Sequence, residues 1–181
     1  MEIRPLRLHG TCEILLPPHH DDRGYFMRVY DEAIFHEYSL QTSWVQENQS
    51  QSIRKYTIRG LHFQRPPHAE TKLVRVVTGA ILDVFVDLRK DSETYGQWDS
   101  IELSADNQKM VYIPKGFAHG FCTLTEKTVV LYKIDSAYAS EFEGGLRWND
   151  DTLGIQWPTN GPYLSAKDRM LPSFDEFVSP F

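Results

Sequence analysis

The sequence has little cysteine and no long hydrophobic run. Cys12 and Cys122 are the only cysteines among its 181 residues, and they do not form a pair with the spacing of a zinc or redox motif. We therefore expect a reducing, cytoplasmic environment. The most apolar segment, residues 73–88, is interrupted by one arginine and two aspartates, whereas a membrane-spanning helix needs about 20 continuous apolar residues. Because the N-terminal residues also lack the apolar stretch of a cleaved signal peptide, we expect neither export nor a membrane span.

The sequence also lacks an excess of positive charge. It has 19 Lys and Arg against 25 Asp and Glu, which gives a formal net charge of -6. Nucleic acids and anionic membranes repel such a protein at long range, so we expect neither as a partner. A chain of this length buries roughly 70% of the surface that its unfolded form exposes. Residues 1–181 are therefore expected to fold as a single domain without disulfides or a structural metal.

Short segments rich in β-branched residues recur along the middle of the chain. The predicted strands are residues 72–78 and 81–88 around the turn at Gly79, then residues 100–103, 110–113, 120–124 and 129–134. In the segment 81–88 one alternating face is apolar, and the other carries Asp83 and Asp87. We therefore expect one face in the core and the other partly wet or lining a cavity.

Helical signals are weak and local. Asp31 is placed to cap a short helix over residues 32–38, and another turn or two is predicted at residues 173–178. Neither forms part of a repeated β-α-β unit, which excludes the doubly wound nucleotide-binding folds. Many short strands separated by turns are typical of an all-β sandwich or barrel.

Two clusters of polar residues lie among these strands. Residues 59–72 contain two histidines, two arginines and a lysine, a concentration of positive charge that suits a diphosphate. Residues 114–121 form a turn that enters a strand, and we expect His119 at a sheet edge. The two clusters lie where a small jelly-roll barrel of the cupin type carries its two motifs.

Many cupin barrels bind a metal through a His-x-His pair, a following Glu and a later His. Here the pair is broken, because the second residue after His62 is Gln64. A metal site formed by His62, His68, Glu70 and His119 stays open as an alternative.

Tyr132 alternates with Val130 and Ile134 on a predicted strand. Such a tyrosine is usually a core aromatic. In a barrel that holds a ligand, the same inward position would deliver a phenol with a pKa near ~10 as a proton donor.

Seven ordered blocks of the sequence resemble the dTDP-4-dehydrorhamnose 3,5-epimerases. They run from Asp22-Arg23-Gly24-Tyr25-Phe26 through Val45-Gln46-Glu47-Asn48, Arg59-Gly60-Leu61-His62-Phe63-Gln64, Lys72-Leu73-Val74-Arg75-Val76, Pro114-Lys115-Gly116-Phe117-Ala118-His119-Gly120-Phe121 and Trp148-Asn149-Asp150 to Leu164-Ser165-Ala166-Lys167-Asp168. The resemblance implies a double-stranded β-helix, the cupin-type jelly-roll barrel, with short flanking helices. It also implies a homodimer, no metal or organic cofactor, and a 4-keto-6-deoxy sugar on a nucleoside diphosphate as substrate.

The resemblance further implies roles for residues at matching positions. His62 matches the general base, Asp168 the carboxylate that orients it, and Tyr132 the opposing general acid. Tyr138 matches the aromatic that stacks near the nucleoside. The positions that match substrate-binding residues are Arg23, Gln46, Asn48, Arg59, Lys72, His119, Glu143 and Lys167.

The chemistry gives a reason for these residue types. Both epimerised carbons flank the keto group, so each inversion removes a proton on one face and returns one on the other. A histidine base, a tyrosine acid and a cation near the enolate oxygen satisfy this demand. Lys72 can supply that cation, or it can hold phosphate.

Arg28 departs from the family pattern. The family commonly has a glutamate there, two residues after the phenylalanine of the first block. A carboxylate can accept the N–H of thymine, whereas arginine only donates. Either Arg28 belongs to the substrate site and selects another nucleobase, or it pairs with Asp31 or Glu32. His19, at a position that is often aromatic in the family, leaves the same question open.

The sequence thus predicts an epimerase that converts dTDP-4-dehydro-6-deoxyglucose to dTDP-4-dehydrorhamnose. The alternatives are an enzyme that inverts only one carbon, one that acts on a non-thymidine sugar nucleotide, a metal-dependent cupin enzyme, and a non-catalytic sugar-nucleotide-binding module.

Overall fold

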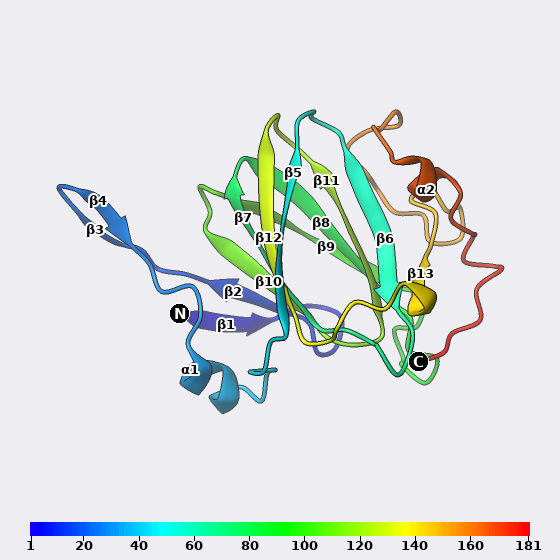
Figure 1. Ribbon diagram of the computed structural model, residues 1–181, viewed down its shortest axis with the longest axis horizontal. Helices are drawn as coiled ribbons and strands as arrows, with labels where there is room; N and C mark the ends of the chain where they lie inside the picture. Colours follow the sequence, from blue (N-terminus) through cyan, green and yellow to red (C-terminus); the bar gives the residue numbers. More distant parts are fainter.

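Two antiparallel sheets pack face to face as a barrel in the computed structural model, which describes residues 1–181 (Figure 1). The six-stranded sheet has the order β1 (Glu2–Pro5), β2 (Cys12–Leu15), β10 (Lys109–Ile113), β7 (Lys72–Thr78), β12 (Thr128–Ile134) and β5 (Gln46–Ser52). The five-stranded sheet has the order β13 (Glu143–Gly145), β6 (Ile58–Gln64), β11 (Phe117–Thr123), β8 (Ala80–Asp87) and β9 (Trp98–Ser104). Because neighbouring strands come from distant parts of the sequence, the arrangement is that of a jelly roll, and the predicted fold class is confirmed.

All six predicted strands are present as β7 to β12; β7 has the predicted bounds, and the other five have shifted ends. The first two of them do not pair with each other: β7 pairs with β10 and β12, whereas β8 pairs with β9 and β11. The turn at Gly79, with a φ of 79°, therefore carries the chain from one sheet to the other. The side chains of Thr125 and Thr128 fill the space that a side chain at Gly79 would need.

Both faces of β8 are buried, so of the two expectations for the face with Asp83 and Asp87, partly wet or lining a cavity, the first is wrong. Ile81 and Phe85 point into the barrel core. Val84 and Val86 lie on the outer face and pack under the C-terminal segment, which runs along this side of the barrel (Figure 1). The aspartates on the inward face are not solvated but have protein partners: Asp87 pairs with Arg89, and Asp83 pairs with a histidine described below.

The two helices are short. Helix α1 (Glu32–Glu37) begins after Asp31, whose side chain accepts a hydrogen bond from the backbone N–H of Ile34, as predicted. Residues 173–178 form only a single turn, in which the N–H of Phe177 donates to the carbonyl of Phe174. Helix α2 (Ala166–Arg169) and the 3-10 turn η1 (Ser140–Phe142) were not predicted. No helix combines the length and the apolar character that crossing a membrane requires.

A two-stranded hairpin, β3 (His19–Asp21) and β4 (Gly24–Phe26), extends away from the barrel (Figure 1). Tyr25 and Phe26 on β4 are 56% and 67% exposed. An isolated two-stranded hairpin has little stability of its own, because it has no core to pack against. The hairpin therefore presents apolar side chains that another surface can cover.

The pairing of β6 with β11 brings two backbones unusually close at Gly60. His62 lies opposite His119 in this pairing, and the register shifts between His119 and Phe121. Gly60 has a φ of 124°, and a Cβ there would lie 2.6 Å from Cα of Gly120 and 2.7 Å from the carbonyl oxygen of His119. Only glycine meets both conditions without strain.

We predict that Gly60→Ala destabilises the protein by about 2 kcal/mol or more, because it adds a clash with backbone atoms to an unfavourable φ. Urea unfolding measures the change. Gly161→Ala is the matched control, because nothing lies within 4 Å of a Cβ at that loop position. Equal stability of the two variants would contradict the close approach of β6 and β11.

Candidate active site

A cleft opens between the two sheets and has two adjoining lobes that meet at His62, Lys72 and Tyr132. The first lobe, which we call the His119 lobe, has a volume of about 450 Å³ and includes Arg59, His119, Lys167 and Asp168 in its lining. The second, the Tyr138 lobe, has a volume of about 580 Å³ and includes Gln46, Asn48, Glu70, Tyr138 and Glu143. Eleven of the thirteen predicted site residues therefore line one cleft; Arg23 and Arg28 do not.

His62 is held by Asp168. The Nε2 of His62, on β6, lies 2.7 Å from Oδ1 of Asp168, in the first turn of α2. Ser165 caps α2 by accepting the N–H of Asp168 at 3.0 Å, which fixes the carboxylate in this place. A neutral imidazole carries one N–H, and the one on Nε2 goes to the carboxylate, so Nδ1 is left as the acceptor.

Asp168 stays a carboxylate in this position. Burial alone would raise its pKa, but the hydrogen bond and the charge of His62 outweigh burial and lower the pKa below its usual range. A charged carboxylate next to the ring also stabilises the imidazolium that forms when His62 takes up a proton.

Tyr132 lies on β12, in the sheet opposite His62. Its inward orientation with Val130, predicted from the alternation of the strand, is confirmed by their packing with the barrel core. Burial raises the pKa of the Tyr132 phenol; the charge of Arg59 opposes this rise and the charge of Glu70 adds to it. Tyr132 therefore keeps its proton at neutral pH.

His119 belongs to a second histidine–carboxylate pair. Its Nε2 lies 2.9 Å from Oδ2 of Asp83, a fully buried residue on β8. Because β11 lies between β6 and β8, His119 is in the middle of its sheet, and the expected position at a sheet edge is wrong. Asp83 was not predicted as a site residue, although an aspartate in an otherwise apolar strand was the available signal. Burial raises its pKa, and its Oδ1 has no hydrogen-bond partner in the chain.

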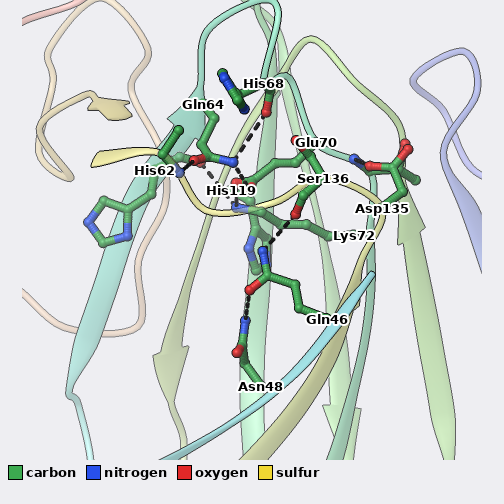
Figure 2. Close-up of polar contacts among 12 residues, drawn as sticks. Gln46, Asn48, His62, Gln64, His68, Glu70, Lys72, His119, Asp135 and Ser136 are labelled. Carbon is green, nitrogen blue, oxygen red and sulfur yellow. Dashed lines mark hydrogen bonds and ion pairs between the residues drawn. The ribbon is translucent and has the colours of Figure 1, made fainter. Parts of the chain in front are cut away.

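Polar side chains around the cleft are held by a network of hydrogen bonds (Figure 2). Asn48 donates to the side-chain oxygen of Gln46 at 3.3 Å, and Gln46 donates to the carbonyl of Ser136 at 2.7 Å. Arg59 donates to the hydroxyl of Ser52 at 3.1 Å and to a backbone carbonyl. These contacts fix the polar groups of β5 and β6 before any ligand is bound.

The Tyr138 lobe has an exposed aromatic at its rim. The hydroxyl of Tyr138 donates to Glu143 at 3.1 Å, and the ammonium of Lys167 lies 2.6 Å from the same carboxylate. Burial alone would raise the pKa of Glu143, but Lys167 and Tyr138 lower it. The rim thus offers a flat aromatic surface and a lysine within reach of an anionic ligand.

Arg23 and Arg28 lie outside the cleft of their own chain. Arg23, in the turn of the β3–β4 hairpin, is 90% exposed and pairs with Asp21 at 2.5 Å. Arg28 follows the hairpin and pairs with Asp31 at 2.8 Å, which is one of the two arrangements expected from the sequence.

The four residues of the alternative metal site do not converge. His62 and His119 pair with different aspartates, Glu70 pairs with Lys72, and the ring of His68 packs against Phe142 at 4.6 Å. No group of three or more His, Cys, Asp or Glu side chains in the chain is arranged to hold a metal ion.

Comparison with known proteins places these features in one family. A model of the dTDP-4-dehydrorhamnose 3,5-epimerase family matches residues 5–176. The dTDP-4-dehydrorhamnose 3,5-epimerase of Salmonella typhimurium is 46% identical over 158 residues, 86% of each chain. A dTDP-4-dehydrorhamnose 3-epimerase of Streptomyces niveus is 36% identical over 170 residues, 93% of this chain and 82% of the relative.

The fold agrees equally well with a solved structure. The crystal structure of dTDP-4-dehydrorhamnose 3,5-epimerase from Bacillus anthracis, with TDP and PPi bound, has a TM-score of 0.93 and 46% sequence identity. The match covers 95% of this chain and 98% of that one. The chain therefore belongs to the dTDP-4-dehydrorhamnose 3,5-epimerase family, and the predicted isomerase class is confirmed.

Proposed function

We propose that this protein inverts the two carbons that flank the keto group of dTDP-4-dehydro-6-deoxy-D-glucose and so forms dTDP-4-dehydro-L-rhamnose. The observation that carries the proposal is the cleft in which a histidine held by a buried carboxylate and a tyrosine come from opposite sheets. The names of the relatives and the TDP bound in the Bacillus anthracis structure support this substrate.

His62 acts as the general base in this proposal. Nδ1 of the imidazole removes a proton from a carbon next to the keto group, since Nε2 donates to Asp168. The electron pair of the broken C–H bond forms a C=C bond, and the keto oxygen becomes an enolate oxygen. Lys72 lies where the two lobes meet, so its ammonium stabilises this oxygen more strongly than it stabilises the neutral ketone.

Tyr132 completes the inversion from the other side of the sugar. Its phenol gives a proton to the opposite face of the same carbon, and the enolate returns to the ketone. The raised pKa of Tyr132 keeps the proton in place until this step. Exchange with solvent then restores the phenol and the neutral imidazole, and the second carbon follows the same sequence of steps.

The remaining residues of the cleft hold the substrate. Arg59 and Lys167 give the His119 lobe a cationic lining that suits the diphosphate, and His119 offers a ring nitrogen to the sugar oxygens. Tyr138 stacks on the nucleobase at the rim, and Gln46, Asn48 and Glu143 offer hydrogen bonds along the Tyr138 lobe.

The β3–β4 hairpin supports a homodimer. Arg23 can contact substrate only in another chain's cleft, because it lies on a hairpin that extends from its own barrel. The exposed Tyr25 and Phe26 give this hairpin an apolar surface that a second copy would cover. We infer that each hairpin supplies Arg23 to the cleft of the partner subunit.

The enzyme proposed here is a single-domain cytoplasmic protein. The two unpaired cysteines and the acidic net charge are the observations that favour this location and disfavour nucleic acid and membranes as partners.

The direct test of function is turnover of dTDP-4-dehydro-6-deoxy-D-glucose, coupled to a reductase that consumes the epimerised ketone. Turnover supports the proposal, and its absence with well-folded protein contradicts it.

We predict that His62→Ala and Tyr132→Phe both abolish net epimerisation but differ in deuterated solvent. Without His62 no proton leaves, so exchange at the substrate carbons falls by about 100-fold or more. With Tyr132→Phe the base still exchanges the proton on one face, while inversion fails. Mass spectrometry of recovered substrate measures both, and exchange at the wild-type rate in His62→Ala would show that the base is assigned wrongly.

We predict that Arg23→Ala and His62→Ala, each inactive alone, regain activity when the two chains form mixed dimers. One cleft of such a dimer combines an intact His62 with an intact Arg23 from the partner, so random pairing restores about one quarter of the wild-type activity. A mixture of His62→Ala and Tyr132→Phe is the control, because no cleft is then intact. Failure of the first mixture to recover activity would contradict the exchange of hairpins.

Because Arg28 pairs with Asp31, we predict that Arg28 does not select the nucleobase. Wild type and Arg28→Glu should then both bind thymidine diphosphate more tightly than the uridine, cytidine and guanosine diphosphates in calorimetric titrations. The opposite result is a wild type that prefers another nucleotide, with thymidine diphosphate bound more tightly by the variant. It would assign Arg28 to base recognition and the protein to a different sugar nucleotide.

A further inference from the structure

A largely buried carboxylate in the lining of the Tyr138 lobe has no role in the chemistry described above. Glu70 lies in the connection between β6 and β7, and its Oε1 is 3.0 Å from the ammonium of Lys72. Each of the two side chains is only 10% exposed, which distinguishes this ion pair from the solvated pairs elsewhere on the barrel. Surface pairs contribute little, but removing one partner of a buried pair leaves an uncompensated charge.

Gln64 fixes the other oxygen of this carboxylate. Its amide nitrogen donates to Oε2 of Glu70 at 3.0 Å, as Figure 2 shows. Gln64 is itself buried, and its side-chain oxygen accepts the backbone N–H of Ala139 at 2.7 Å. A continuous series of contacts thus runs from the backbone at Ala139 through Gln64 and Glu70 to Lys72.

These contacts limit where the ammonium of Lys72 can lie. It has three N–H donors, of which one is directed at Glu70 and another at the carbonyl oxygen of His62, 3.4 Å away. The third donor is left for a ligand in the part of the cleft where the two lobes meet. Without the carboxylate, the flexible side chain of Lys72 would lose this ion pair and could turn toward solvent.

We propose that Glu70 is a positioning residue: held by Gln64, it keeps the ammonium of Lys72 aimed at the keto oxygen of the substrate. This inference rests on the proposed epimerase function, because it assigns Lys72 to the enolate oxygen. It predicts that Glu70 affects the rate of proton removal and not the binding of the diphosphate, which contacts other cations of the cleft.

The test compares Glu70→Gln, Lys72→Met and the double variant in turnover and in thymidine diphosphate titrations. The glutamine keeps the shape and the hydrogen bond to Gln64 but removes the charge. We expect its kcat to fall about ten-fold or more with little change in KM. Complete removal of a donor to an oxyanion typically lowers kcat by about 100- to 1,000-fold, which sets the upper limit of the effect. Binding of thymidine diphosphate should stay at the wild-type level.

The double variant separates positioning from a general structural role. If Glu70 acts through Lys72, the double variant loses no more activity than Lys72→Met alone. Losses that multiply, or a wild-type kcat in Glu70→Gln, would overturn the proposal. The control is Glu13→Gln, which removes the carboxylate of a Glu–Lys pair of 2.6 Å on the β2–β10 strands, away from the cleft, and should leave kcat unchanged.

Failure of the epimerase proposal would look different, because the wild type itself would then show no turnover. In that event a crystal structure of Glu70→Gln still decides the positioning role. Displacement of the Lys72 ammonium by about 1 Å or more supports it, since shifts of this size are catalytically costly. An ammonium that keeps its wild-type position would overturn it.

Discussion

The hydrogen bond between His62 and Asp168 is the contact on which the rest of the site depends. It joins β6 to the short helix α2, 106 residues later in the chain, and so closes the cleft on the side of the five-stranded sheet. It also decides which imidazole nitrogen is free to act as a base. The cap at Ser165 and the close approach at Gly60 both serve this contact, because each fixes the backbone from which one partner extends.

The charged side chains that the barrel buries beside the cleft occur in pairs. Asp83 pairs with His119, and Glu70 pairs with Lys72, so neither carboxylate lies in the barrel without a partner. Such pairing is what allows a closed sheet structure to hold cations next to an apolar core. The uncharged Tyr132 needs no such partner, and burial is the largest of the effects that raise its pKa and keep its proton in place.

The fold class and most residues of the cleft could be predicted from the sequence. The elements and contacts that depend on tertiary packing could not. Strand β5, Gln46–Ser52, contains no apolar residue and was not predicted; it is a strand because its backbone pairs with β12 along its whole length, and its polar side chains line the cleft. Asp83 was seen only as a polar interruption, because its partner lies on another strand. Glu70 was seen only as a possible metal ligand, because its pairing with Lys72 depends on how the connection between β6 and β7 folds. The position of the β3–β4 hairpin depends on tertiary contacts, and no local sequence pattern predicts it.

The central claim is that one base and one acid invert both carbons through enolates formed on either side of the keto group. It is tested most directly by running the wild-type reaction in deuterium oxide and counting deuterium in the reduced product by mass spectrometry. The account predicts one solvent-derived deuteron at each of the two carbons that flank the keto group. Deuterium at only one of them would mean a single-position epimerase, and a product without solvent deuterium at either carbon would contradict the enolate mechanism.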